Sequence, residues 1–270
     1  MKLKEFFYKV LLKPNYCFYE STKSSLGIFK DNELEFYQWN TPKSSKYRLN
    51  HDEVKELSSF INDGDIAIDV GAHIGDSSLP IALACGSKGI VIAFEPNPIV
   101  FTILTKNSFI NRKCTNIYPV PFACLNSEKS LVFKYSDPWL ANGGDKTSYG
   151  FLDGNSFPLP INGINPVNLI KEIKEQRKRK IKYLKIDVEG QDYYVLKQFE
   201  KIIESDRPYI KFEIAKFTNE NLREKIKIFF KTKDYELYLV DREHEKLYGK
   251  KFKTKYFYSR ETIDVFCKPN

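Results

Sequence analysis

The chain has 270 residues, of which 42% are hydrophobic and 15% aromatic, enough for one large domain or a domain with an extension. Its mean hydropathy of −0.44 and the lack of about 18–20 uninterrupted apolar residues argue against a membrane-spanning protein. The net charge of +8 helps to hold an anionic substrate nearby but says little about function. Five scattered cysteines, never spaced as C-x-x-C, predict reduced thiols in a cytoplasmic protein and argue against a disulfide framework or a zinc site.

Residues 1–62 are predicted to form an N-terminal extension that caps the site. The basic, amphipathic start MKLKEFFYKVLLK has no cleavage signal, so we expect it to pack on the body, with peripheral contact to a membrane as the alternative. LGIFK and LEFYQW have strand character. Asn50, with Glu53 three residues later, is placed to cap a helix that ends at Asn62-Asp63-Gly64.

Residues 63–270 are predicted to form the main domain, in which strand and helix patterns alternate. The first three predicted strands are residues 66–71, 89–96 and 116–124, the last of which contains two prolines. Four more lie in KYLKIDVEG, PYIKFEI, YELYLVD and TIDVFCKP. The alternation predicts an α/β fold with a doubly wound, mostly parallel sheet. No clear helix separates the last two strands, so we expect them to pair antiparallel at one edge.

Residues 126–164 do not fit the alternation. A predicted strand, SLVFKYSD, is followed by the long loop NGGDKTSYGFLDGNSFPLPING. So long a loop in a compact domain is usually functional or disordered, and we expect a substrate-side insertion. The densest basic cluster, KEQRKRK at 174–180, is predicted to be a solvated helix C-terminus rather than a nucleic-acid patch.

Acidic residues recur where the predicted parallel strands end. They are Asp69, Glu95, the pair Asp187 and Glu189, and Glu213. In open parallel sheets, ligands bind outside the carboxyl ends of the strands. Four strands with this feature in a protein of net charge +8 predict a site for a ligand that carries positive charge and hydroxyl groups.

The first strand is followed by the turn DVGAHIG, residues 69–75, whose glycines allow close approach of a ligand to the backbone. His73 and Asp76 stand where the dinucleotide fingerprint has its second and third glycines, so no pyrophosphate cradle is predicted. Glu95 lies 24 residues beyond Gly71, a spacing typical of an acid that binds ribose hydroxyls. A nucleoside without a pyrophosphate fits this pattern, and S-adenosylmethionine is such a ligand.

Three motifs in this order, DVGAHIG (69–75), FEPNP (94–98) and YLKIDVEG (183–190), resemble the FkbM family of S-adenosylmethionine-dependent methyltransferases. The resemblance covers about residues 66–215. It implies the seven-stranded, Rossmann-like methyltransferase fold, with carbohydrate modification by O-methylation of sugars, or O-methylation of natural-product hydroxyls, as the common activity. One departure is INPVNL (164–169), which lacks the acid of a Leu-Asp pair found in many members and leaves helix capping to Asn165.

By position, the resemblance implies roles for several residues. Those expected to contact the donor are Asp69, Gly71, His73, Gly75, Ser77, Glu95, Asn97, Phe122 and Ala123, with Glu95 on the ribose hydroxyls and Phe122-Ala123 near the adenine. The segment Asn142, Gly143 and Gly144 is similar to a family loop that reaches the active site, and Glu213 is a further candidate for contact with the substrate.

Methyl transfer to oxygen needs an aligned acceptor and a route for the hydroxyl proton. Asp187 and Glu189 are the leading catalytic candidates as general bases. The alternatives are that they bind a divalent metal such as Mg²⁺ with Glu213, that they position donor or acceptor, or that they stabilise the turn. His73 is a minor catalytic candidate because its place in the glycine turn favours a simple hydrogen bond.

The leading hypothesis is therefore an S-adenosylmethionine-dependent O-methyltransferase that acts on a hydroxyl of a sugar or glycoconjugate. The alternatives are a nucleic-acid methyltransferase and a non-catalytic binding module that keeps the fold. We expect a small-molecule or glycan partner and no nucleic acid, because the sequence lacks the alternation of aromatic and basic residues that stacks bases.

Overall fold

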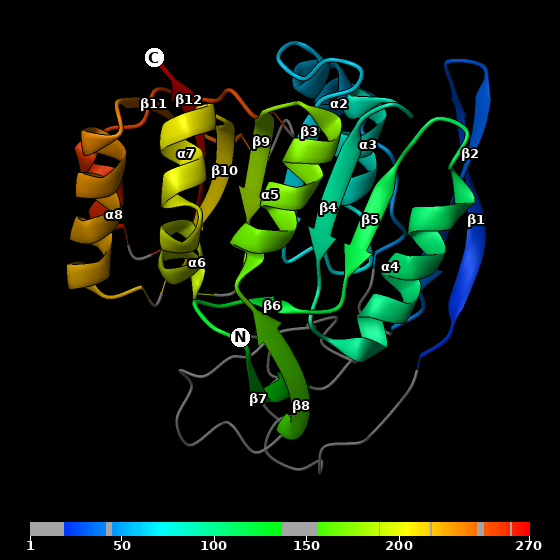
Figure 1. The fold of residues 1–270 in the computed structure, drawn as a ribbon, viewed down its shortest axis with the longest axis horizontal. Helices are drawn as coiled ribbons and strands as arrows, with labels where there is room; N and C mark the ends of the chain where they lie inside the picture. Colours follow the sequence, from blue (N-terminus) through cyan, green and yellow to red (C-terminus); the bar gives the residue numbers. More distant parts are fainter. Residues whose placement is uncertain are drawn as a thin grey trace.

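The computed structural model describes residues 19–41, 45–136, 156–188, 190–216, 218–241, 246–259 and 261–270. Its centre is a seven-stranded sheet, shown in Figure 1. The strand order is β11 (Tyr235–Leu239), β12 (Ile263–Pro269), β10 (Tyr209–Ile214), β9 (Ile181–Ile186), β3 (Ile66–Val70), β4 (Ile90–Phe94) and β5 (Ile117–Val120). The predicted seven-stranded α/β sheet is thereby confirmed.

Strands β10, β9, β3, β4 and β5 run parallel. The expected antiparallel pairing of the last two strands is confirmed, since β12 pairs antiparallel with β11. Strand β12 also pairs antiparallel with β10, so it lies one place inside the edge and β11 is outermost.

Helices cover both faces of the sheet, as the doubly wound prediction requires (Figure 1). One face packs against α5 (Pro166–Arg177), α6 (Asp192–Gln198), α7 (Glu200–Asp206) and α8 (Glu220–Thr232). The other packs against α2 (His51–Ser58), α3 (Ser78–Cys85) and, through Leu104, α4 (Pro98–Ile110). Alternate residues of a strand pack on opposite faces of the sheet. In β3, Ile66, Ile68 and Val70 pack on the face covered by α5–α8, and Ala67 packs on the face covered by α2–α4. A short 3₁₀ helix, η3 (Thr254–Tyr258), precedes β12.

Two proline-containing segments differ from the sequence prediction. Residues 116–124 form two strands, β5 and β6 (Ala123–Cys124), that belong to different sheets. Pro119 is tolerated in β5 because that strand is at the edge of the central sheet. The predicted loop is wrong for its last part, which forms β8 (Ser156–Ile164), paired antiparallel with β7 (Lys129–Ser136) and parallel with β6.

The prolines in β8 explain why its strand character was missed. Pro158 and Pro160 are two residues apart, so the positions of their missing N–H groups point to the same side of the strand. Among the described strands, the one that pairs on that side is β6, and it pairs only with Gly163 and Ile164. The strand therefore keeps its ladder with β7 despite both prolines.

The N-terminal region begins with an antiparallel hairpin, β1 (Ser21–Phe29) and β2 (Asn32–Trp39), which lies beside α4 in Figure 1. Asn50 caps α2 as predicted, accepting hydrogen bonds from the backbone N–H groups of Asp52 and Glu53. Within the described residues, no helix is both long and apolar enough to cross a membrane. The predicted amphipathic start lies outside the described residues.

The strand order predicts where on the sheet a ligand binds. From β3 the chain moves outward through β4 to β5, and it later returns to the other side of β3 as β9. The order therefore reverses between β3 and β9. In open α/β sheets, the crevice outside the carboxyl ends at such a point is the usual ligand site.

Candidate functional site

The turn after β3 carries the glycine motif in a backbone conformation that only some residues tolerate. Gly71 and Gly75 have φ of +82° and +94°, and His73 between them has φ of +49°. A Cβ on Gly71 would lie 1.9 Å from the carbonyl oxygen of Asp187. The end of β9 thus packs directly against the glycine turn, which is possible only because residue 71 has no side chain.

Asp69, at the end of β3, is completely buried, and its Oδ1 has no hydrogen-bond partner among the described residues. Its Oδ2 accepts hydrogen bonds from the hydroxyls of Ser77 and Ser78, both at 2.7 Å. Its Oδ1 lies 3.3 Å from the ammonium of Lys185 on the neighbouring strand β9. The predicted donor residues Asp69 and Ser77 therefore hold each other, and Asp69 is not an open acid at the rim.

Lys185 is a site residue that the sequence analysis did not single out. Besides Asp69, its Nζ lies 3.5 Å from Oδ2 of Asp187 and 3.4 Å from the carbonyl oxygen of Gly71. Burial acts to lower the pKa of this ammonium, but the negative charges of Asp69 and Asp187 prevail and raise it. The available signal was the strand alternation, which places Lys185 on the same face as Asp187.

Glu95 follows β4 and is almost completely buried, with 6% of its surface exposed. Its two oxygens accept backbone hydrogen bonds from His73 at 2.9 Å and from Asn97 at 2.8 Å. Burial raises the pKa of this carboxyl to about 7, although the two N–H groups act in the opposite direction. Asn97 is buried as well, and its side chain caps α4 at the N–H of Ile99.

His73 is held in the same turn. Its Nε2 is buried and has no hydrogen-bond partner among the described residues. Burial lowers the pKa of the imidazole, which favours the neutral form at pH 7. The ring packs edge-on against Trp39 of β2, with 5.6 Å between ring centroids. The N-terminal hairpin therefore contacts the glycine turn directly.

Asp187 lies just after β9 and is half-exposed, with 44% of its side chain accessible. Its backbone N–H donates to the carbonyl oxygen of Val70, which ties it to the end of β3. Behind it, the buried carboxylate of Asp192 accepts from the N–H groups of Val188 and Gly190, and burial raises the pKa of Asp192 to about 7. The sequence analysis did not single out this support for the turn.

The remaining predicted residues lie in different places. Glu213 is near the end of β10, where it is aligned with Asp264 of β12. Phe122 and Ala123 follow the carboxyl end of β5, so they lie at the same edge of the parallel sheet as the glycine turn. Glu189 and the segment Asn142, Gly143 and Gly144 lie outside the described residues. Within the described part of the chain, no group of three or more His, Cys, Asp or Glu side chains could hold a metal ion.

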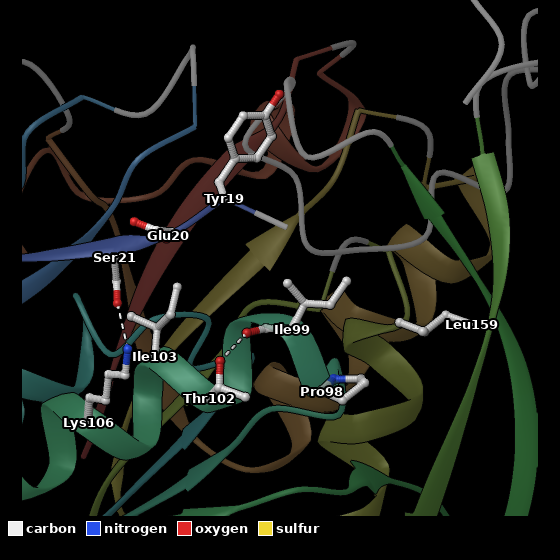
Figure 2. Close-up of a pocket in the computed structure, with 9 residues that line it drawn as sticks. All are labelled: Tyr19, Glu20, Ser21, Pro98, Ile99, Thr102, Ile103, Lys106 and Leu159. Atoms are coloured by element: carbon white, nitrogen blue, oxygen red, sulfur yellow. Dashed lines mark hydrogen bonds between the residues drawn. The ribbon is translucent and has the colours of Figure 1, made fainter. Parts of the chain in front are cut away.

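A cavity of about 310 Å³ lies beside the start of α4. Figure 2 shows its lining: Ile99 and Ile103 of α4, Leu159 of β8, and Tyr19 and Ser21 from the start of the hairpin. Lys106 of α4 donates to the Ser21 hydroxyl at 3.0 Å at one end of the cavity. The lining is apolar in its middle and carries hydroxyl and charged groups at its rim.

A family model described as the methyltransferase FkbM domain matches residues 69–246, well over half of the chain. The chain belongs to the FkbM methyltransferase family. The match begins at Asp69, so it contains the glycine turn, Glu95 and the Lys185–Asp187 strand end, whereas the hairpin β1–β2 precedes it. The family resemblance of the three sequence motifs is thereby confirmed.

The chain is also similar to the hexuronic acid methyltransferase AglP of Haloferax volcanii, to which it is 32% identical over 158 residues. The match covers 58% of this chain and 59% of that protein, so the chain spans about three fifths of the length of this curated relative.

Solved structures give looser matches. A methyltransferase FkbM of Methylobacillus flagellatus KT is 15% identical, with a TM-score of 0.44, covering 76% of this chain and 43% of that chain. TYW2 of M. jannaschii, solved with AdoMet, is 16% identical, with a TM-score of 0.44; the match covers 94% of this chain and 86% of that chain. The fold assignment rests on the strand order itself.

The residues at the switch point fit S-adenosylmethionine, the methyl donor of the FkbM family. Glu95 presents a buried carboxylate whose oxygens each accept one backbone hydrogen bond and keep a lone pair for a hydroxyl donor. The buried Nε2 of His73 has no partner among the described side chains and is free for a ligand. The space that a Cβ would need at positions 71 and 75 is filled by the Asp187 carbonyl and by α4, so the two glycines let the turn pack closely against its neighbours rather than open space for a ligand.

Proposed function

We propose that this FkbM-family protein transfers a methyl group from S-adenosylmethionine to a hydroxyl of a sugar, free or within a glycoconjugate. The observation that carries the proposal is the half-exposed carboxylate of Asp187 at the switch point, beside the donor-binding turn. The sugar class is supported by the relationship to a hexuronic acid methyltransferase. The free thiols of Cys85, Cys114, Cys124 and Cys267 support a cytoplasmic location.

The donor end of the proposed site consists of Glu95 and the glycine turn. When bound, S-adenosylmethionine supplies an activated methyl group on a sulfonium. Glu95 accepts hydrogen bonds from ribose hydroxyls, while Asn97 and the backbone of His73 fix its orientation. Phe122 and Ala123 provide apolar surface for the adenine. Asp69, Ser77 and Lys185 hold the strand ends on which the turn is built.

Asp187 is the proposed catalytic residue for the acceptor. As the new oxygen–carbon bond forms and the sulfur–carbon bond breaks, the hydroxyl proton passes to the Asp187 carboxylate. The ammonium of Lys185 lies 3.5 Å from Oδ2 of Asp187 and helps to hold the carboxylate in place. The main contribution of Asp187 is to orient the hydroxyl, and it accepts the proton as the new bond forms.

The acceptor is proposed to extend over the cavity in Figure 2. Its apolar middle suits the C–H face of a sugar ring, and its rim offers the hydroxyls of Ser21 and Thr102 as hydrogen-bond partners. A uronic acid adds a carboxylate, for which the ammonium of Lys106 is a partner of opposite charge.

The test is a methyl-transfer assay with methyl-labelled donor against uronic-acid oligosaccharides, neutral oligosaccharides and RNA, each with Mg²⁺ and with a chelator. We expect methyl label on a uronic-acid or neutral saccharide and none on RNA. Asp187→Asn should lower turnover by about 10²-fold or more, the scale of general base catalysis. The matched control is Asp63→Asn, an exposed acid of the loop that precedes β3. Label on RNA alone, or unchanged turnover in Asp187→Asn, would refute the proposal.

A further inference from the structure

Helix α4 carries a buried amide that connects two parts of the proposed donor site. Asn107 is 2% exposed. Its Oδ1 accepts from the backbone N–H of Tyr37 in β2 at 2.7 Å, and its Nδ2 donates to the carbonyl oxygen of Tyr37 at 3.1 Å. The second Nδ2 hydrogen is donated to the carbonyl oxygen of Ile74 at 2.8 Å. Both donor hydrogens of the amide are thereby used.

Asn111 makes the same contact one helical turn later, with one difference. Its Oδ1 accepts from the N–H of Glu35 at 3.1 Å, and its Nδ2 donates to the carbonyl oxygen of Glu35 at 2.8 Å. The two amides, four residues apart, satisfy the free edge of β2 in the way that a neighbouring strand would. Only Asn107 adds a bond to the glycine turn.

The residue that Asn107 holds is central to that turn. Ile74 lies between His73 and Gly75, both of which have positive φ. Helix α4 also supports the turn from behind, since a Cβ on Gly75 would meet Leu104 at 3.0 Å and Asn107 at 3.7 Å. On the other side, Trp39 of the same hairpin packs against the His73 ring.

We infer that Asn107 is a positioning residue that couples the N-terminal hairpin to the donor-binding turn. It does not touch the donor; it fixes the carbonyl of Ile74, and with it the backbone that presents the N–H of His73 to Glu95. The hairpin, which precedes the family match, thereby becomes part of the donor site. The inference rests on the proposed function, because it assumes that the donor binds at this turn.

The test compares Asn107→Ala, within α4, with Asn111→Ala, at the C-cap of the same helix. Each variant loses the same side-chain amide and its two hydrogen bonds to one residue of β2. Both should unfold at lower urea concentration than the parent. At a temperature where all three are folded, Asn107→Ala should bind S-adenosylhomocysteine on the order of tenfold more weakly by calorimetry, the effect of one lost hydrogen bond. Asn111→Ala should stay within about twofold. The inference is wrong if the two variants bind equally well.

A second measurement uses the unaltered protein and does not depend on a variant that folds. Binding of S-adenosylhomocysteine should slow hydrogen exchange at the amide of Tyr37, which bonds Asn107, more than at the amide of Glu35, which bonds Asn111. Equal protection at both amides would overturn the inference. If the unaltered protein does not bind S-adenosylhomocysteine at all, the proposed function itself fails, which distinguishes the two cases.

Discussion

Lys185 determines the charge balance of the site at the scale of single residues. It lies between a buried acid, Asp69, and a half-exposed acid, Asp187. Oδ2 of Asp69 accepts hydrogen bonds from two neutral hydroxyls, which carry no charge. Among the described residues, the positive charge that balances Asp69 therefore comes from Lys185. An uncompensated carboxylate in this position would be costly, because ionised groups are poorly solvated in a protein interior.

We therefore predict that Lys185→Met lowers the free energy of unfolding by about 3–5 kcal/mol, the usual cost of breaking a buried ion pair by removing one partner. Urea unfolding followed by circular dichroism measures this loss. The double variant Lys185→Met with Asp69→Asn should recover part of it, because the buried charge is then removed as well.

The matched control is Lys171→Met, which removes a lysine from the exposed i,i+4 pair with Glu175. Its effect should stay within about 1 kcal/mol. An equal loss in the two lysine variants would show that the buried pair has no special role in stability.

At the scale of elements, the joint between β3 and β9 positions the site. The backbone N–H of Asp187 donates to Val70, and the carbonyl of Asp187 occupies the space that a side chain on residue 71 would need. The glycine turn and the end of β9 therefore pack closely against each other, and a change in one displaces the other.

Gly71→Ala is predicted to displace this joint. The substitution combines positive φ with a Cβ placed 1.9 Å from the Asp187 carbonyl oxygen. We expect a loss of stability well above the roughly 1–2 kcal/mol that positive φ alone costs a residue with a Cβ, together with a loss of methyl transfer. Urea unfolding and the labelled-methyl assay measure the two effects.

Gly64→Ala is the control for backbone strain. Gly64 has φ of +92°, but a Cβ there would meet only the end of the Arg179 side chain, at 3.8 Å. This variant should show the cost of positive φ and keep its activity. If Gly71→Ala and Gly64→Ala behave alike, the close approach of Asp187 to the turn does not matter.

The seven strands of the central sheet could be predicted because their apolar residues are local and repeated. Ile66, Ile68 and Val70 already show a strand in the sequence, and the glycine turn follows at once. Residues 116–124 and 156–164 were predicted less well because their prolines are acceptable only at particular sheet edges. Sheet edges are a property of the assembled fold.

The candidate site was predictable only in part for a related reason. The positions of Asp69, Glu95 and Asp187 follow from the strand ends, so the sequence could place them together. Their partners come from other elements: Lys185 reaches across to Asp69, and Asn107 of α4 reaches both the hairpin and the turn. Such contacts depend on how layers pack, for which a single sequence gives no local signal.

At the scale of the whole molecule, the acids predicted along the carboxyl edge of the sheet differ in burial and in charge compensation. The chain is basic overall, with a net charge of +8. Asp69 is neutralised by Lys185, Glu95 is buried with a raised pKa, and Asp187 is open. Among these described acids, Asp187 offers a half-exposed carboxylate, which the proposed function places toward the acceptor, and Glu95 offers a buried carboxylate, half ionised near pH 7, which it places toward the donor.

The most direct test of this account is calorimetric binding of S-adenosylhomocysteine to the parent and to Glu95→Gln between pH 6 and pH 8. Because the pKa of Glu95 is raised to about 7, the carboxylate that is proposed to accept the ribose hydroxyls is lost as the pH falls through 7. The parent should therefore bind up to about tenfold more tightly at pH 8 than at pH 6. Glu95→Gln should bind roughly ten- to a hundredfold more weakly than the parent at pH 8, without this pH dependence. A folded Glu95→Gln variant that binds as tightly as the parent would contradict the placement of the donor at this edge of the sheet.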